Sequence, residues 1–396
     1  MNVRAGLRAA CLMLVAGLAC CASPLSRAAA GNATVESCKL PKSSPAPAVD
    51  WAGKNVLWLG TSIPHQGRGR DGYPEQFCKL MNCRVTNNAF SGSHIRWFES
   101  GGDESCARGR NAPKGLSATT RELREKIDAA LPDDGRSSYN DSCSRATRPV
   151  TMSYEERINA PWSSTRFDVV VIDHGHNDRG PGPSRDALDP GKLDPDPIRI
   201  EAVVKGRVTE IRLPVGHGLA ANDDITIRTP GIPRLDFWTG EVAQAGRSSI
   251  TIGFDSSALD GGLAGSGTLV RYDKSKLFDA FNLVISDIYH MNSFHGGPKP
   301  TIVLLTPPTE WTGAANDGSV ARTNSAICEV AAKWRLPYYN MTAELGIGAE
   351  DLRFVLPDGV HPTTAEGRQY IAQHIAAWAS GGRVTKPRKY WPTGNR

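Results

Sequence analysis

The chain has 396 residues, of which 40% are hydrophobic and 22% are charged, and its formal net charge is +5. This length holds one large domain, or a core domain that carries a second module, and the composition is typical of a globular protein. Because the net charge is small and no Lys/Arg stripe is interleaved with aromatic residues, the sequence argues against nucleic acid as a partner.

The first 30 residues have the character of a signal peptide. Arg4 and Arg8 precede an apolar run over 9–22, which is too short to span a bilayer comfortably, and the alanines at 28–30 offer a small-residue cleavage site. We therefore expect an exported protein, either periplasmic or secreted. No later segment of the sequence is long and apolar enough for a membrane span.

Two cysteines at the end of the apolar run offer a lipoprotein anchor as an alternative. A lipidation site needs Leu at position −3 of the cysteine together with Gly or Ala at −1. Cys20 has Gly17 at −3, and Cys21 follows another cysteine, so neither satisfies the pattern. The sequence favours a periplasmic or secreted protein over a lipid-anchored one.

Six of the nine cysteines lie beyond the predicted signal peptide. An even number of cysteines in an exported chain suggests disulfides, with fifteen possible connectivities. Cys78 with Cys83 is the local pair that we expect, and Cys106 with Cys143 could close a long loop. Buried free thiols are the alternative. No pair has CxxC spacing, which argues against a zinc site.

Residues 31–50 are rich in Ser, Pro and Ala and are interpreted as a linker.

The stretch NVLWLGTS, at 55–62, is an apolar run of β-forming residues that ends at Gly60, which predicts a buried strand and a tight turn. A strand that is apolar on both faces suits a parallel sheet covered by helices, where ligands bind at the C-terminal strand ends. Ser62 would lie at such an end; a turn serine that caps the next segment is the alternative.

The next elements complete a β-turn-α-β unit, which is the building block of a parallel sheet. Helical spacing of apolar residues predicts a helix at 73–81, and CRVTN at 83–87 predicts a short strand. Gly92 follows this strand, where a backbone N–H can approach a ligand closely because no Cβ stands beside it. From 97 to 166 the pattern loosens around one helix expected at 119–131, as in a functional lid or a solvated loop.

The second strong strand signal is FDVVVIDHGHN at 167–177. Its apolar part, 168–172, predicts a fully buried strand, with polar residues at its C-terminal end. Asn177 is a candidate there, because an Asn side chain is a good amide donor to a developing oxyanion. Neighbours on an extended segment point to opposite faces, which argues against a metal site made by the acidic and histidine residues Asp173, His174, His176 and Asp178.

Residues 196–272 differ in character from the segments around them. Alternating stretches punctuated by Gly and Pro clusters predict a small inserted all-β module, with strands at 198–204, 208–213, 224–228 and 249–254. The phrase HGLAANDDITI, at 217–227, resembles HGL…GD-type β modules of bacteriophage tail and related surface proteins, but it has Asn222 where those usually have Gly. His217 is interpreted as a turn residue.

The remaining chain again alternates helices and strands. We expect helices at 275–291, 319–334 and 363–378, and strands at 301–305 and 336–339. Together with the earlier elements, this alternation predicts an α/β sandwich with a parallel sheet.

Asp358 precedes His361 by three residues in a Gly-containing turn, just before the last expected helix. Such an Asp can fold back onto one imidazole nitrogen and leave the other free, which is the relation of orienter and base in a hydrolytic triad. A turn-forming Asp next to a helix-start His is the alternative.

Four blocks in one order resemble the motif blocks of the SGNH hydrolases, also called GDSL-like esterases: GTS at 60–62, NxAxSG at 87–92, GHND at 175–178 and DGVHP at 358–362. The resemblance covers most of residues 52–380 outside the β module. It implies a flavodoxin-like three-layer α/β/α sandwich. The sequence itself indicates no cofactor and no metal. The roles that the resemblance implies are the nucleophile Ser62, the base His361, its orienter Asp358, and an oxyanion hole made by the backbone N–H groups of Ser62 and Gly92 and the side chain of Asn177.

Thr61 is a departure, since the family usually has Asp before the nucleophile; this bears on the subgroup more than on the triad. The G-x-S-x-G elbow of α/β-hydrolases is absent, which argues against that other esterase fold. The chain thus divides into a signal peptide (1–30), a linker (31–50), a first part of the hydrolase domain (51–195), the inserted β module (196–272), a second part (273–385) and a basic tail (386–396).

The expected function is that of an exported serine esterase that hydrolyses acyl esters, with O-acetylated glycans as first candidate substrates and lipid or aryl esters as second. An O-acyltransferase with a sugar acceptor has the same triad and stays open. So does a non-catalytic glycan-binding protein on this scaffold, although the intact Ser62, Asp358 and His361 speak against it. The sequence does not indicate an oligomeric state.

Overall fold

The computed structural model describes residues 38, 42–91, 93–96, 155–179, 190–229, 232, 234–259, 263–309 and 319–387. They belong to one compact unit that spans 31–396. Several expected features lie outside the described residues: the signal peptide, the helix at 119–131, most of the basic tail, Gly92, Cys106 and Cys143.

The centre of this unit is a parallel five-stranded sheet with the order β11-β10-β3-β1-β2. With its strands counted along the chain, this is the flavodoxin-like order 2-1-3-4-5, in which the connections reverse direction between the first and third strands. The expectation of a flavodoxin-like parallel sheet is confirmed. The strands are β1 (Asn55–Gly60), β2 (Arg84–Ala89), β3 (Val169–Asp173), β10 (Thr301–Leu305) and β11 (Tyr338–Tyr339).

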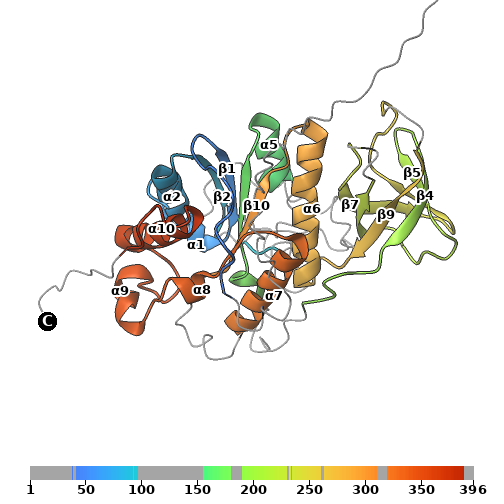
Figure 1. The fold of residues 1–396 in the computed structure, drawn as a ribbon. Helices are drawn as coiled ribbons and strands as arrows, with labels where there is room; N and C mark the ends of the chain where they lie inside the picture. Colours follow the sequence, from blue (N-terminus) through green and yellow to red (C-terminus); the bar gives the residue numbers. More distant parts are fainter. Residues whose placement is uncertain are drawn as a thin grey trace, which may run out of the picture. The chain divides into compact units, whose positions relative to one another are not determined.

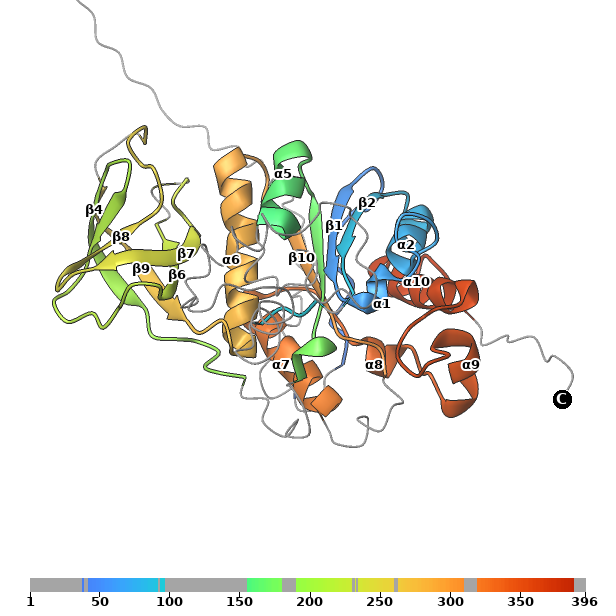
Figure 2. The same ribbon diagram turned by 180° about the vertical axis from the view of Figure 1, so that it is seen from behind.

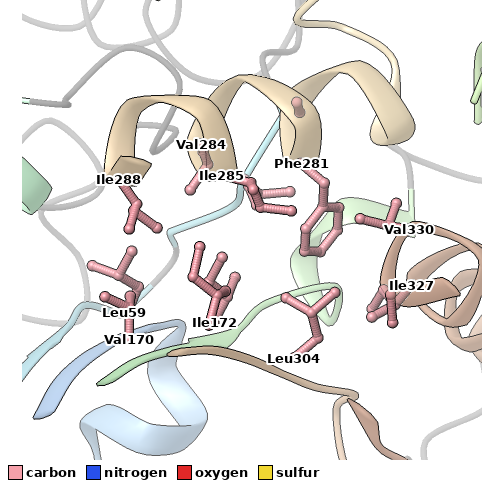
Figure 3. Packing of buried hydrophobic residues seen from close by; sticks show 14 of the residues in the cluster. Leu59, Val170, Ile172, Phe281, Val284, Ile285, Ile288, Leu304, Ile327 and Val330 are labelled. Atoms are coloured by element: carbon pink, nitrogen blue, oxygen red, sulfur yellow. The ribbon is translucent and has the colours of Figure 1, made fainter. Parts of the chain in front are cut away.

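Helices cover both faces of the sheet, giving three layers (Figure 1). On one face α6 (Leu277–His295) and α7 (Ser319–Trp334) pack against residues such as Leu59 and Ile172 (Figure 3). On the other face α2 (Tyr73–Met81) and α10 (Ala365–Ala379) cover the residues between those. Because successive side chains of a strand alternate in direction, a strand buried on both faces must be apolar throughout.

The inserted segment forms a closed barrel with the strand order β4-β5-β8-β7-β6-β9 (Figure 2). It has its own apolar core, which includes Ile211, Ile227 and Leu269. The inserted all-β module is thus present, with two strands that the sequence patterns did not indicate, β7 and β9. The barrel strands are β4 (Ile198–Val204), β5 (Thr209–Arg212), β6 (Asp224–Arg228), β7 (Thr239–Ala245), β8 (Ser249–Ile252) and β9 (Leu263–Tyr272).

The barrel is fixed to the helix that follows it. Phe237, from the β6–β7 connection, belongs to the core cluster of the sandwich, with its ring centroid 5.2 Å from that of Tyr289 on α6. Lys274, just before α6, makes ion pairs with Asp224 (3.1 Å) and Glu241 (3.2 Å) of two barrel strands. These contacts are those of a packed interface rather than of a tethered module.

Short helical turns complete the described residues. They are α1 (Ser62–His65), a π-helical turn (Glu155–Asn159) that leads into α5 (Ala160–Ser164), α8 (Met341–Glu344), α9 (Leu352–Val355), and 3₁₀ turns at Asn177–Arg179 and Ala349–Asp351. The last long helix, α10, begins two residues later than expected, because the Thr364 hydroxyl caps it by accepting the N–H of Gly367 at 3.0 Å.

Among the described residues, no helix is both long and apolar enough to cross a bilayer.

Two disulfides are present in the described part of the chain. The expected local pair Cys78–Cys83 is confirmed, and Cys38 is joined to Cys328 on α7. Part of the stretch interpreted as a linker lies beside β11: the Ser44 N–H donates to the Tyr338 carbonyl at 2.8 Å, and the Ser44 hydroxyl accepts from the Tyr338 N–H at 2.9 Å. This segment therefore covers the edge of the sheet.

Candidate active site

Ser62 lies at the C-terminal end of β1, as expected for a group at the ligand-binding edge of a parallel sheet. It is the first residue of α1, where the Thr61 hydroxyl caps the helix by accepting the N–H of Ile63 at 3.3 Å. The turn requires glycine at position 60, since a Cβ there would stand 2.2 Å from the Pro64 side chain. Ser62 itself is 5% exposed.

The structure brings Ser62 together with His361 and Asp358. Ser62 Oγ lies 2.8 Å from His361 Nε2, and His361 Nδ1 lies 2.7 Å from Asp358 Oδ2. The other carboxylate oxygen of Asp358 accepts the backbone N–H groups of Val360 at 2.9 Å and His361 at 2.6 Å. The three side chains form one continuous hydrogen-bonded line, as nucleophilic catalysis by a serine requires.

The charge on Asp358 determines which nitrogen of His361 carries the proton. Partial burial raises the pKa of Asp358, but hydrogen bonds from the backbone and ring of His361 and from the backbone of Val360 outweigh it, and the pKa lies below its usual value. An ionised carboxylate only accepts, so Nδ1 of His361 must donate to it. The remaining nitrogen, Nε2, then accepts the Ser62 hydroxyl proton.

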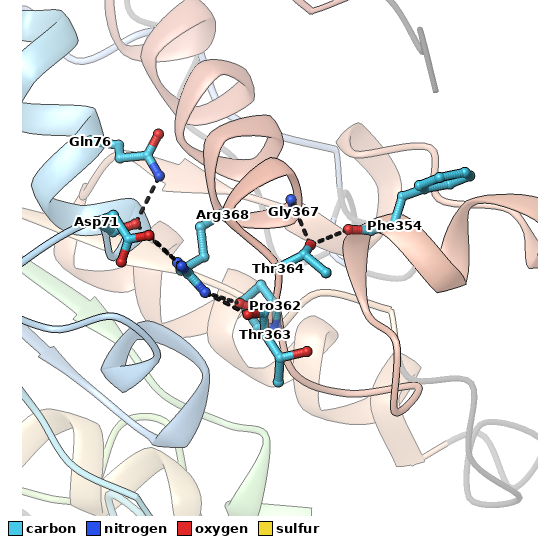
Figure 4. A network of polar contacts seen from close by, with 8 residues as sticks. All are labelled: Asp71, Gln76, Phe354, Pro362, Thr363, Thr364, Gly367 and Arg368. Carbon is cyan, nitrogen blue, oxygen red and sulfur yellow. Dashed lines mark hydrogen bonds and ion pairs between the residues drawn. The ribbon is translucent and has the colours of Figure 1, made fainter. Parts of the chain in front are cut away.

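Arg368 holds the loop that carries His361 (Figure 4). Its guanidinium donates to the carbonyls of Pro362 (3.2 Å) and Thr363 (2.8 Å), the two residues that follow His361. The same group donates to the backbone carbonyl of Asp71 at 3.0 Å and forms an ion pair with the Asp71 carboxylate. The loop that carries His361 is thereby tied to the chain just before α2.

Asn177 lies in the 3₁₀ turn that follows β3. Its side-chain amide donates to the Ser93 carbonyl at 2.8 Å, which orients the amide and occupies one of its two hydrogens. Gly175, two residues earlier, has a φ of +121°, and a Cβ there would lie 2.8 Å from Ile327 Cδ1, so only glycine fits. The second predicted oxyanion donor, Gly92, lies outside the described residues.

Asp178 has a structural role that the sequence motif did not indicate. Its buried carboxylate accepts the N–H groups of Ile95 (2.8 Å), Arg96 (3.0 Å) and Gly175 (3.1 Å). Burial raises the pKa of this carboxyl, and the charges of His94 and Arg96 and the backbone donors act against that shift. Asp178 thus joins the loop after β2 to the loop after β3.

His176 and Asp173 also lie close to these elements. The His176 ring centroid is 6.5 Å from that of His361, so this side chain flanks the His361 ring. Asp173, at the end of β3, is fully buried and accepts hydrogen bonds from Trp58 Nε1 at 3.1 Å and from the Tyr73 hydroxyl. Burial raises the pKa of Asp173 to about 7, against the opposing effect of these two donors.

The acidic side chains near β3 have partners of other kinds. Across the described ranges, no group of three or more His, Cys, Asp or Glu side chains is arranged to hold a metal ion. Asp173 and Asp178 are instead engaged with Trp58 and with backbone N–H groups respectively.

No protein-family model and no curated protein match this chain. Among solved structures, the chain is similar to a variant of an acetyl xylan esterase from Geobacillus stearothermophilus (12% identity, TM-score 0.37, 85% of this chain and 99% of that one). It is also similar to a structure described as a GDSL-like lipase from Parabacteroides merdae (14% identity, TM-score 0.35, 87% and 100%) and to a peptidoglycan O-acetylesterase (8% identity, TM-score 0.26, 85% and 97%).

These TM-scores are all below 0.5, so the likenesses are remote and the roles of the residues rest on the geometry of this chain. The sheet has the flavodoxin-like strand order, and the four sequence blocks follow one another in the order in which they resemble those of the SGNH hydrolases. Three of the four blocks lie entirely in the described residues, and the block at 87–92 lies there except for its last glycine.

Proposed function

We propose that the protein is an exported serine esterase that hydrolyses acyl esters, O-acetyl esters of carbohydrates in the first place, through an acyl-enzyme. The observation that carries this proposal is the line from Ser62 Oγ to His361 Nε2 (2.8 Å) and from His361 Nδ1 to Asp358 Oδ2 (2.7 Å). A hydroxyl in such a line is activated by its neighbouring base, whereas a turn serine needs neither a base nor an orienter.

The reaction proceeds in two steps. His361 Nε2 takes the Ser62 proton while Oγ attacks the ester carbonyl, and the imidazolium gives this proton to the leaving alcohol. Water then attacks the acyl-enzyme by the same route, releasing the acid and restoring Ser62. Asn177 and the backbone N–H groups of Ser62 and Gly92 are proposed to bind the tetrahedral oxyanion in both steps.

Two observations support export. The sequence begins with the charged, apolar and small-residue pattern of a signal peptide. The described residues contain two disulfides, Cys38–Cys328 and Cys78–Cys83, and disulfides persist in oxidising compartments. Cell fractionation of the full-length chain, followed by N-terminal sequencing, tests this part; a product that stays in the cytosol and keeps residues 1–30 would contradict it.

The decisive experiment for the activity is hydrolysis of a short-chain aryl acetate by the mature protein beside its Ser62→Ala variant. We expect activity in the parent and its loss in Ser62→Ala, with no change in Ser163→Ala, whose hydroxyl lies at the exposed end of α5. In labelling by a fluorophosphonate, Ser62 Oγ should displace fluoride, so that the peptide containing Ser62 gains the mass of the phosphonyl group. Activity that survives in Ser62→Ala would exclude the proposed nucleophile.

The substrate class is tested by release of acetate from O-acetylated polysaccharides. Acetate release into water supports hydrolysis. An acyl-enzyme that forms but turns over only when a sugar acceptor is added would instead identify an acyltransferase with the same triad. A folded protein that neither labels nor hydrolyses, but binds acetylated glycan, would indicate a binding protein.

A further inference from the structure

A buried arginine connects the nucleophile turn to the loop that holds Asn177. Arg157 lies in the π-helical turn Glu155–Asn159 and is 0% exposed. One arm of its guanidinium, Nη2, donates to the Gly60 carbonyl at 3.1 Å, and the other, Nη1, donates to the Ser93 hydroxyl at 2.8 Å. Gly60 stands two residues before Ser62.

Ser93 is engaged at both of its oxygens. Its hydroxyl accepts from Arg157, and its carbonyl accepts the side-chain amide of Asn177 at 2.8 Å. A single path of hydrogen bonds therefore runs from the Gly60 carbonyl through Arg157 and Ser93 to Asn177. The two ends of this path are the turn of the proposed nucleophile and the side chain of a proposed oxyanion donor.

The surroundings keep Arg157 in place. Its own carbonyl accepts the Asn88 side-chain amide at 2.9 Å, which ties the π-helical turn to β2. Its guanidinium lies over the ring of Phe90, 4.9 Å from the centroid, and the backbone N–H of Phe90 donates to the same Gly60 carbonyl at 3.1 Å. The Arg157 side chain thus joins the turn after β1, at Gly60, to the segment after β2, at Phe90 and Ser93.

We propose that Arg157 is a positioning residue, which sets the distance between the Ser62 hydroxyl and the oxyanion-binding amide of Asn177. The proposal rests on the proposed esterase function. A guanidinium suits this task because its planar fork reaches two acceptors at once, whereas an ammonium on a flexible stem does not hold two acceptors in a fixed geometry. Groups that act together in acyl transfer must be held within about 0.5 Å of their productive positions.

The first test uses Arg157→Lys, which keeps the charge and removes the fork. With an aryl acetate, we expect kcat to fall about tenfold to a hundredfold while KM changes less than threefold, because the ground-state substrate does not need the oxyanion donor. Arg84→Lys is the matched control: Arg84 also makes two side-chain hydrogen bonds, to Asn55 Oδ1 and the Gly53 carbonyl, at the opposite end of the sheet. An unchanged kcat in Arg157→Lys would overturn the proposal.

A double-mutant cycle asks whether Arg157 acts through Asn177. In the Asn177→Ala background the oxyanion amide is already missing, so Arg157→Lys should lower kcat by less than threefold further. If the two losses simply multiply, Arg157 does not work through that amide and the proposal is wrong. Ser93→Ala, which removes the hydroxyl that accepts from Arg157, should reproduce part of the Arg157→Lys loss.

A readout that needs no turnover separates this proposal from the esterase assignment. Amide hydrogen exchange in Arg157→Lys should become faster at Phe90 and in the segments 60–66 and 93–96, and should stay unchanged in the barrel and in α10. If the wild type has no esterase activity but these segments exchange faster in Arg157→Lys, the proposed function is refuted and the connection made by Arg157 is retained. Unchanged exchange in those segments would refute the bridge, whatever the activity.

Discussion

His361 Nε2 lies 2.8 Å from Ser62 Oγ, although 299 residues separate the two in the chain. Two loops at the same edge of the sheet bring them together: the turn after β1, and the turn before α10 that Arg368 holds. The barrel lies between them in the sequence, so its insertion leaves their relation intact. If this pair acts as proposed, substitutions of the residues around it should have specific effects on activity.

Asp358→Asn should lower kcat by about 10²–10⁴-fold with little change in KM. An amide at this position can donate to Nδ1 of His361, which favours the tautomer that cannot accept the Ser62 proton. Steady-state kinetics on an aryl acetate measures the effect, with Asp50→Asn as the control on an exposed carboxylate. Wild-type turnover in Asp358→Asn would show that His361 is oriented by other groups.

Asn177→Ala should lower kcat by about 10²–10³-fold, the usual effect of losing one oxyanion donor. The matched control is Asn292→Ala, since Asn292 is on α6 and its amide donates only to the nearby Gly297 carbonyl at 3.3 Å among the contacts described. Affinity for a boronate transition-state analogue should fall in parallel with kcat in Asn177→Ala. Full activity would remove Asn177 from the oxyanion hole.

Asp173 predicts how stability depends on pH. Its pKa in the folded protein is about 7, above the ordinary 3.8, so the folded state holds this proton more tightly than the unfolded state. The associated stability is fully present below about pH 4 and is lost as pH rises through 7, a change on the order of 4 kcal/mol. Asp224 and Asp279, each with a pKa raised by burial to about 6, add to the same slope.

Asp173→Asn should remove part of that slope, because the amide stays neutral at every pH. Urea unfolding at pH 5 and pH 8 measures it: relative to the wild type, the variant should gain stability at the higher pH. Equal free-energy differences at the two pH values would mean that Asp173 does not titrate between them.

The two disulfides should differ in their contribution to stability. Cys38–Cys328 joins residues 290 positions apart, whereas Cys78–Cys83 closes a separation of 5. In the chain-entropy model, the long loop contributes on the order of 5 kcal/mol to the free energy of unfolding and the short one about 2 kcal/mol. Denaturant unfolding of the two double Cys→Ser variants tests the order; a larger loss for the short loop would contradict it.

Much of the sandwich could be predicted because its elements have strong local patterns. The strand at 301–305 and the helix at 319–334 have the predicted bounds, since an apolar run between turn residues and a helical spacing of apolar residues each specify one structure. The pairing of Ser62 with His361 was expected from the resemblance of the four motif blocks, and the structure places the two side chains within hydrogen-bond distance. The catalytic roles of these residues remain predictions.

The elements that escaped prediction lack such patterns. In β7, TGEVAQA, only Val242 is buried, and β9 contains two glycines within LAGSGTLVRY. Neither sequence pattern predicts a strand by itself. They are strands because closure of the barrel supplies partners on both sides. The bond between Cys38 and Cys328, and the bridge made by Arg157, join segments that are distant in sequence, and one sequence does not encode such pairings locally.

The register between β4 and β9 has a consequence for how this architecture could arise. Ile198, near the start of the insert, pairs with Leu269, near its end, so the chain enters and leaves the barrel at adjacent points. In the path of the chain, the whole barrel therefore takes the place of one connection between β3 and α6. In evolution, such an insert can be gained, exchanged or lost without a change in the strand order of the sheet, and the edge that holds Ser62 and His361 keeps its arrangement.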